Sequence, residues 1–98
     1  MAYGKGRCWW ADGSYYEGFF EFNKRNRRGF YIFPGGKDRY IGDFVDDKRH
    51  GEGEMSYADG TLFVGSWEND VPNREEAVEC YPNGDKYFGR FKDGFQYI

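Results

Sequence analysis

A short pattern of aromatic residues around a glycine recurs along the chain. It reads aromatic-x-Gly-x-aromatic, and an Asp-Gly, Gly-Gly or Asn-Gly pair stands a few residues before each copy. This alternation is typical of half-buried β-strands, and the preceding pair indicates a tight hairpin turn. Successive copies begin 24, 23 and 24 residues apart, which indicates a repeat array. The copies are Tyr16-Gly18-Phe20, Tyr40-Gly42-Phe44, Phe63-Gly65-Trp67 and Tyr87-Gly89-Phe91.

The pattern predicts one β-hairpin in each repeat and an all-β fold without a long helix. First strands are expected near residues 6–10, 29–33, 53–57 and 77–81, and second strands near 14–21, 38–45, 61–68 and 85–92. The polar segments NKRNRR, DDKRH and ENDVPNRE lie between them and are expected to form loops. The whole chain is one domain, with repeats at approximately 4–27, 28–51, 52–75 and 76–98.

The hairpin register decides which residues share a face of the sheet. A two-residue loop at Asp59-Gly60 would pair Tyr57 with Leu62, whereas a three-residue loop would pair Met55 with Phe63. We favour the three-residue loop because it aligns glycines across the strands. The expected pairs are Gly6 with Gly18, Gly29 with Gly42 and Gly53 with Gly65, while Ala77 falls opposite Gly89 in the last repeat.

In this register most aromatic rings share one face, where the glycine rows leave room for them. We interpret these rings as structural core. They are Trp10, Tyr16, Phe20, Tyr31, Phe33, Tyr40, Phe44, Tyr57, Phe63, Trp67, Tyr81, Tyr87 and Phe91.

The second face is also apolar in the first two repeats, although one side of a single-layer sheet should be polar. We hypothesise that repeats one and two dock a partner protein or a second copy through this face. The alternative is that the face curls into a core of its own. The candidate partner-binding residues are Trp9, Tyr15, Phe19, Phe30, Ile32, Ile41 and Val45.

Basic residues gather in the first two polar segments between repeats. Equivalent loops stack along one edge of the sheet, so their cations are expected to form a local basic strip that contacts acidic lipid headgroups or an acidic protein. A solvated loop edge is the alternative. The residues are Lys24, Arg25, Arg27, Arg28, Lys48 and Arg49.

Composition narrows the partners and the compartment. A net charge of -3 and an aromatic content of 22% give no indication of nucleic-acid binding. No apolar run approaches the ~20 residues of a membrane-spanning helix, and the start lacks the apolar core of a secretory signal. Cys8 and Cys80 fall in distant repeats and on opposite faces, so we expect free thiols and a reducing, cytoplasmic compartment.

The segments YEGFF at 16–20, KRHGEG at 48–53 and DG at 59–60 together resemble MORN repeats, over nearly the whole chain. Arg27-Arg28-Gly29 and Glu75-Glu76-Ala77 depart from the Gly-x-Gly of that pattern. The resemblance implies an elongated single-layer antiparallel sheet of stacked hairpins. It also implies a scaffold that docks partners or self-associates, often within the cytoskeleton, cilium or axoneme. Phosphoinositide binding as a membrane tether is the alternative, and a regulatory part of an enzyme is a third.

The sequence offers few candidate catalytic residues. His50 is the single histidine and is expected to be a loop residue satisfied by backbone groups. One histidine cannot assemble a histidine-based metal cluster, and the two cysteines lie in distant repeats. The carboxylates Asp12 and Asp59 occupy turn positions, where they bond nearby backbone. We therefore expect no enzyme, no catalytic residues, no cofactor and no metal.

Overall fold

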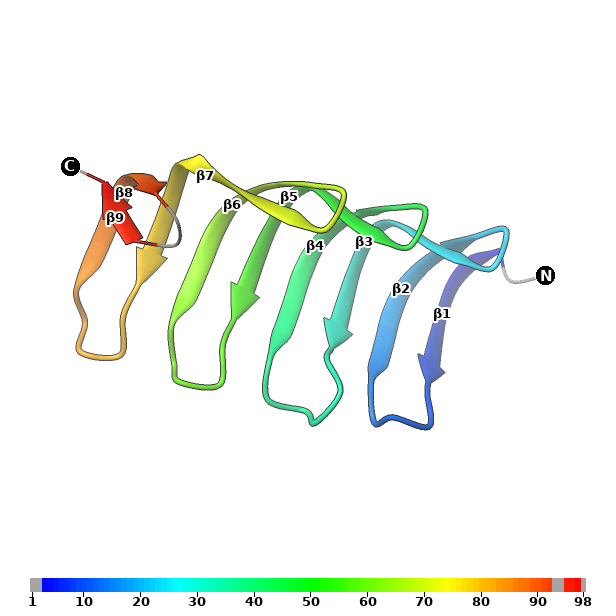
Figure 1. Cartoon of the computed structure of the whole chain (residues 1–98). Helices are drawn as coiled ribbons and strands as arrows, with labels where there is room; N and C mark the ends of the chain where they lie inside the picture. Colours follow the sequence, from blue (N-terminus) through cyan, green and yellow to red (C-terminus); the bar gives the residue numbers. More distant parts are fainter. Residues whose placement is uncertain (1–2, 93–94, 98) are drawn as a thin grey trace.

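The computed structural model describes residues 3–92 and 95–97, and these contain nine β-strands and no helix. The strands join in chain order, each antiparallel to the next, and form one open sheet (Figure 1). This confirms the predicted all-β class and its array of hairpins. The strands are β1 Gly4–Trp9, β2 Tyr15–Glu21, β3 Lys24–Ile32, β4 Arg39–Val45, β5 Lys48–Ser56, β6 Leu62–Glu68, β7 Val71–Cys80, β8 Lys86–Lys92 and β9 Phe95–Tyr97.

The Asp-Gly turns adopt the three-residue loop. At the turn between β5 and β6, the Tyr57 amide donates to the Thr61 carbonyl at 2.8 Å, and the Gly60 amide donates to the Tyr57 carbonyl at 3.0 Å. Gly60 has φ of +93°, as a left-handed loop residue requires. The extra residue in the second repeat is accommodated by Gly35 and Gly36, both at positive φ.

The predicted glycine register is confirmed. The first three hairpins each align two glycines as expected, and the fourth aligns an alanine with a glycine. The pairs are Gly6 with Gly18, Gly29 with Gly42, Gly53 with Gly65 and Ala77 with Gly89.

The predicted polar loops between repeats are wrong. Two-residue turns join the hairpins at Phe22-Asn23, Asp46-Asp47 and Asn69-Asp70, and all six residues have positive φ. That conformation matches a type I′ hairpin turn, which glycine usually serves. Because these turns contain no glycine, they gave no signal, and the polar residues after them extend β3, β5 and β7.

A bulge bends each strand that follows such a turn. Residues 26–28 of β3 stand opposite Phe19 alone, and residues 50–52 of β5 stand opposite Asp43 alone. Arg27 with φ of +58° and Gly51 with φ of +115° occupy equivalent places in the two bulges. Bulges increase local bending and twist, and in Figure 1 the hairpins curve over at their upper ends.

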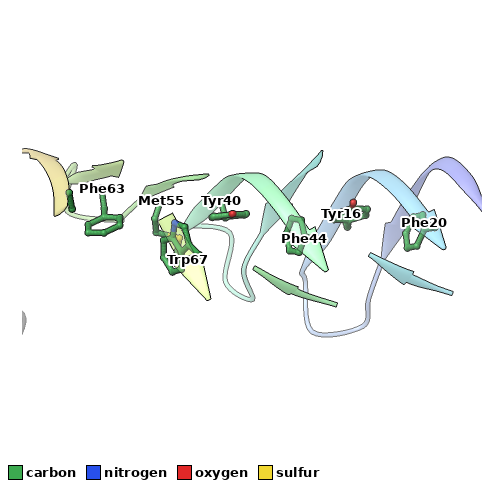
Figure 2. Close-up of a cluster of buried hydrophobic side chains, with 8 residues drawn as sticks. Tyr16, Phe20, Tyr40, Phe44, Met55, Phe63 and Trp67 are labelled. Atoms are coloured by element: carbon green, nitrogen blue, oxygen red, sulfur yellow. The ribbon is translucent and has the colours of Figure 1, made fainter. Parts of the chain in front are cut away.

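An unbroken row of aromatic rings lies on one face of the curved sheet (Figure 2). Neighbouring rings meet edge to face, with centroids 5.0 to 5.6 Å apart. This arrangement is favoured by the ring quadrupoles. Met55 and Ala77 are also buried in this core. Along the array the ring order is Phe20, Tyr16, Phe44, Tyr40, Trp67 and Phe63.

Each buried tyrosine of the row lies over a glycine of the next strand. A Cβ placed on Gly29 or Gly53 would fall within the ring of Tyr16 or Tyr40. The two hydroxyls donate to the bulge carbonyls of residues 19 and 43, each at 2.9 Å. Burial raises the pKa of Tyr16 and of Tyr40 to about 12. The glycine rows therefore serve as sockets for the rings, as predicted.

Candidate functional site

Five of the predicted partner-binding side chains form a patch on the outer face, the face opposite the aromatic row. Trp9 lies against Tyr15 with ring centroids 5.1 Å apart. Tyr15 stands beside Ile32, and Phe30 stands beside Ile41 in the next pair of strands. Trp9 is 68% exposed and Ile41 46%. We call these five residues the N-terminal outer patch.

Phe19 and Val45 belong to the same face but lie outside this patch. Phe19 is at the bulge, where its ring contacts Tyr3 at 6.0 Å and the Arg27 guanidinium at 4.4 Å. Val45 stands beside Lys48 at the turn between β4 and β5 and is 47% exposed. The structure therefore divides the seven predicted residues into a central group of five and two flanking residues.

A second apolar group on the outer face lies toward the other end of the sheet. Val64 stands beside Val78, and Val78 beside Phe88, which is 73% exposed. Leu62 follows in the neighbouring row, and we call these four residues the C-terminal outer patch. Glu54 and Ser56 of β5 separate it from the N-terminal outer patch. The same group could have been identified from the sequence, because the pairing of Ala77 with Gly89 places Val78 and Phe88 on the outer face.

Paired charges border the N-terminal outer patch. The Tyr15 hydroxyl donates to Glu17 Oε1 at 2.6 Å, and that oxygen lies 4.0 Å from Arg7 Nε. The hydrogen bond to Glu17 raises the pKa of Tyr15, with burial and the Glu17 charge adding to it. These contacts orient the Tyr15 ring beside Trp9, so the aromatic pair is held in place before any partner binds.

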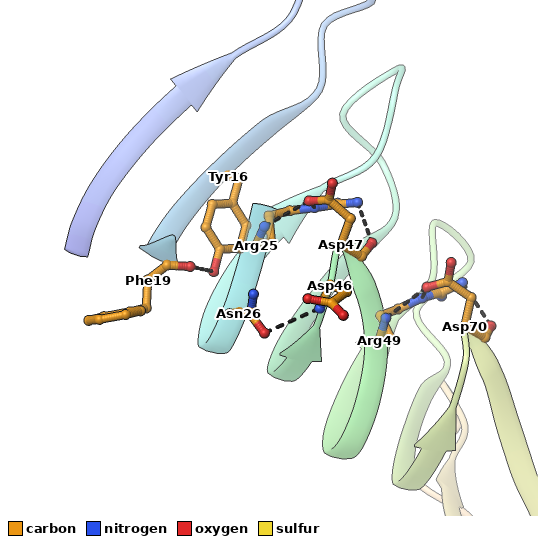
Figure 3. Close-up of polar contacts among 8 residues, drawn as sticks. All are labelled: Tyr16, Phe19, Arg25, Asn26, Asp46, Asp47, Arg49 and Asp70. Carbon is orange, nitrogen blue, oxygen red and sulfur yellow. Dashed lines mark hydrogen bonds and ion pairs between the residues drawn. The ribbon is translucent and has the colours of Figure 1, made fainter. Parts of the chain in front are cut away.

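Two of the predicted basic residues are structural clips between successive hairpins (Figure 3). The Arg25 backbone amide and Nε both donate to Asp47 Oδ1, at 2.7 and 3.2 Å. Arg25 Nη2 donates to the Asp47 carbonyl at 2.6 Å. The guanidinium also lies over the rings of Tyr31 and Phe44, at 4.8 and 5.2 Å. Arg25 therefore ties its own strand, β3, to the turn between β4 and β5.

The clip repeats one hairpin later. The Arg49 amide and Nε donate to Asp70 Oδ1 at 2.8 and 3.2 Å, and Nη2 donates to the Asp70 carbonyl at 3.0 Å. Arg49 also covers the Trp67 ring at 4.6 Å. Each arginine precedes its aspartate by nearly one repeat, 22 and 21 residues.

The remaining basic residues lie in β3 and β5 rather than in loops. Arg27 pairs with Glu21 at 3.2 Å and Arg28 with Asp43 at 3.4 Å. Lys24 and Lys48 are exposed at the beginning of their strands. Each of the four predicted arginines thus lies beside a carboxylate of its own chain, which reduces the net positive charge of this edge.

His50 accepts a hydrogen bond from the Asn69 backbone amide through Nδ1, at 3.3 Å, and it lies in β5 instead of a loop. Backbone satisfaction was predicted, and the loop position was wrong. Cys8 and Cys80 are both free. Among the described residues, no three His, Cys, Asp or Glu side chains gather as a metal site would require. The same residues include no helix long and apolar enough to cross a bilayer.

The repeated hairpins coincide with a known sequence pattern. Residues 4–15, 16–37 and 40–62 each match the MORN repeat. A comparison with curated proteins found no match. The three matching segments span more than half of the chain and contain Tyr16 and Tyr40, the glycines under their rings and the first two bulges, so the chain belongs to the MORN repeat family.

Proposed function

We propose that this protein is a non-catalytic interaction module that docks a partner protein through the N-terminal outer patch. The observation that carries the proposal is the exposure of Trp9 and Ile41 within one apolar group. No described strand covers that group. MORN repeats generally serve as modules that interact with proteins or membranes.

The chemistry of the patch suits a protein surface. Tryptophan and tyrosine dominate the binding energy of many interfaces because they bury large areas with few rotatable bonds. Trp9 and Tyr15 already contact each other, and Glu17 holds the tyrosine hydroxyl. Little side-chain entropy is then lost on binding, which favours affinity.

The membrane alternative has weaker support. A basic residue near an anionic surface contributes only about 1 kcal/mol, and here the four arginines are engaged with carboxylates. Flotation of the chain with vesicles, with and without phosphoinositides and at low and high salt, separates the two functions. Salt-sensitive flotation that needs phosphoinositide would favour the membrane tether.

The test of partner docking compares two variants of the tagged chain. Trp9→Ser with Ile41→Ser changes the N-terminal outer patch, and Phe88→Ser is the matched change in the C-terminal outer patch. We expect the first variant to keep its β-sheet circular dichroism and to lose the proteins that the wild type captures from cells. The Phe88→Ser control is expected to keep them. Equal capture by wild type and the double variant would contradict the proposal.

The captured proteins, identified by mass spectrometry and then tested for direct binding in purified form, would also decide a finer proposal. A cytoskeletal or ciliary protein among the direct binders would support a scaffold role in such an assembly.

A further inference from the structure

The charges around the N-terminal outer patch are unevenly paired. Arg7 and Arg28 each lie beside a carboxylate of their own chain. Arg39 stands between Ile32 and Ser56 on the outer face, and its side chain is exposed. Of the arginine side chains that the structure describes, Arg39 alone forms no ion pair. It is therefore an uncompensated cation at the border of the patch.

Carboxylates follow on the next strand of the same face. Glu54 of β5 stands opposite Ile41, and Glu52 stands opposite Ser66. Both glutamates are exposed, and neither forms an ion pair with a residue that the structure describes. The unpaired charge of the outer face therefore changes sign between β4, which carries Arg39, and β5. We call the two glutamates the acidic stripe.

We propose that the partner segment docked on the N-terminal outer patch is acidic as well as apolar, and that one of its carboxylates pairs with Arg39. This inference rests on the proposed docking function and names the chemistry of the partner. A guanidinium binds a carboxylate through two parallel hydrogen bonds, which fixes the orientation of both groups. Arginine is also enriched, with tryptophan and tyrosine, among the residues that dominate binding energy. Ile32 and Ile41 adjoin Arg39 on this face, so the apolar and the charged contacts are continuous.

The acidic stripe favours a protein segment over an anionic membrane. Both would be attracted by apolar side chains beside a cation. A membrane is a broad surface of one sign, so its contact with the patch would bring Glu52 and Glu54 toward anionic headgroups, and like charges repel. A helical segment is about 10 Å wide, which is roughly two strand spacings of ~4.8 Å. It can therefore lie over β3 and β4, place its carboxylate at Arg39 and leave the stripe on β5 uncovered.

The probe is a library of random peptides displayed on phage. It is selected on the wild-type chain after depletion on the Trp9→Ser, Ile41→Ser variant, so the recovered peptides depend on the patch. We expect them to combine apolar residues with Asp or Glu. A recovered peptide, once synthesised, should bind Arg39→Gln about tenfold more weakly than the wild type, and its affinity should fall with salt. Lys24→Gln is the charge-matched control at the beginning of β3 and should keep the affinity of the wild type.

A second form of the peptide isolates the ion pair. With Asn or Gln in place of its acidic residues, it should bind the wild type more weakly than the acidic peptide does. On Arg39→Gln the same change should lose little further affinity, because the carboxylate and the guanidinium act as one pair. Circular dichroism of Arg39→Gln should match the wild type, since the side chain is exposed.

Recovered peptides without acidic residues, or equal affinity of an acidic peptide for the wild type and Arg39→Gln, would overturn the acidic partner and leave docking itself intact. A failure to recover any peptide that depends on the patch would also overturn it. Flotation of the wild type with anionic vesicles that Arg39→Gln abolishes would overturn it in favour of a membrane. The docking function is decided separately, by the capture experiment on the Trp9→Ser, Ile41→Ser variant.

Discussion

The first two bends of the sheet differ from the third in how a ring meets the backbone. Tyr40 lies over Gly53, and its hydroxyl is bonded to the Asp43 carbonyl, as Tyr16 is at the first bend. In the third bend Phe63 takes the place of the tyrosine and Ala77 that of the glycine. The Tyr40 ring, held by its hydroxyl, leaves no room for a methyl group on residue 53. The Phe63 ring has no hydroxyl to hold it there, and it packs in the same core as the methyl group of Ala77.

The clips follow the same division. Arg25 and Arg49 join the hairpins of the first two bends to the next turn. Pro72 stands opposite Trp67 where an arginine would continue the series. Proline has neither the guanidinium nor the backbone amide that the clip uses. The third bend therefore lacks the arginine clip that the first two bends share.

The largest expected effect is at the glycines under the bends. We expect Gly42→Ala to lower the free energy of unfolding by about 3 kcal/mol, because a Cβ there meets the Gly53 backbone and the Glu52 carbonyl oxygen at 2.5 Å. The matched change Gly65→Ala should cost about 1 kcal/mol or less, since its Cβ finds the Phe63 ring at 3.3 Å. Urea unfolding of both variants measures the difference. Equal losses would mean that the bends do not differ in packing.

The next effect is a coupling between ring and socket. Tyr40→Phe removes the bond to the Asp43 carbonyl and should cost about 1 kcal/mol, and Gly53→Ala should cost about 2 to 3 kcal/mol. The double variant recreates the pair found at the third bend. We expect it to lose about 1 kcal/mol less than the sum of the single changes. Strict additivity in a double-mutant cycle would refute the idea that the hydroxyl fixes the ring.

The clips should have a smaller effect. Arg49→Ala loses its bonds to Asp70 and its cover of Trp67, and we expect a cost of about 1 to 2 kcal/mol. Arg28→Ala is the matched control, because the Arg28 side chain is 66% exposed and pairs with a carboxylate at 3.4 Å. It should cost a few tenths of a kcal/mol. Equal melting temperatures for the two variants would show that the clip does not stabilise the fold.

The sequence predicted the fold correctly at positions where the residue type is the one that the local backbone conformation requires. Asp59-Gly60 specifies the turn, and the aligned glycines specify the register, so both were confirmed. The turn at Phe22-Asn23 could not be recognised because both residues adopt positive φ without a glycine. Arg27 likewise occupies a left-handed position where Gly51 stands in the next repeat.

The candidate site was predicted in part for a similar reason. Alternation along a strand placed Trp9 and Ile41 on the outer face, and the structure brings them into one patch with Tyr15. The alternation of apolar and polar residues gives the face on which a residue lies, but it does not give how far along the strand the bend lies. Phe19 lies at the bend and Val45 at the turn beyond it, so both fall outside the patch. The partners of the arginines also depend on turns that the sequence did not reveal.

The last effect appears only at alkaline pH and again depends on the two tyrosine bends. Tyr16 and Tyr40 have a pKa of about 12 because burial disfavours the phenolate, against about 10 in the unfolded chain. The folded state thus holds these protons more tightly. This contribution is fully present below about pH 10 and is lost as the pH rises toward 12. A Tyr16→Phe and Tyr40→Phe variant has no phenols at these sites, so the stability advantage of the wild type over it should narrow across that window. Urea midpoints of both chains at a series of pH values measure this stability advantage. An advantage that stays constant with pH would show that the pKa values of the two hydroxyls do not change on unfolding.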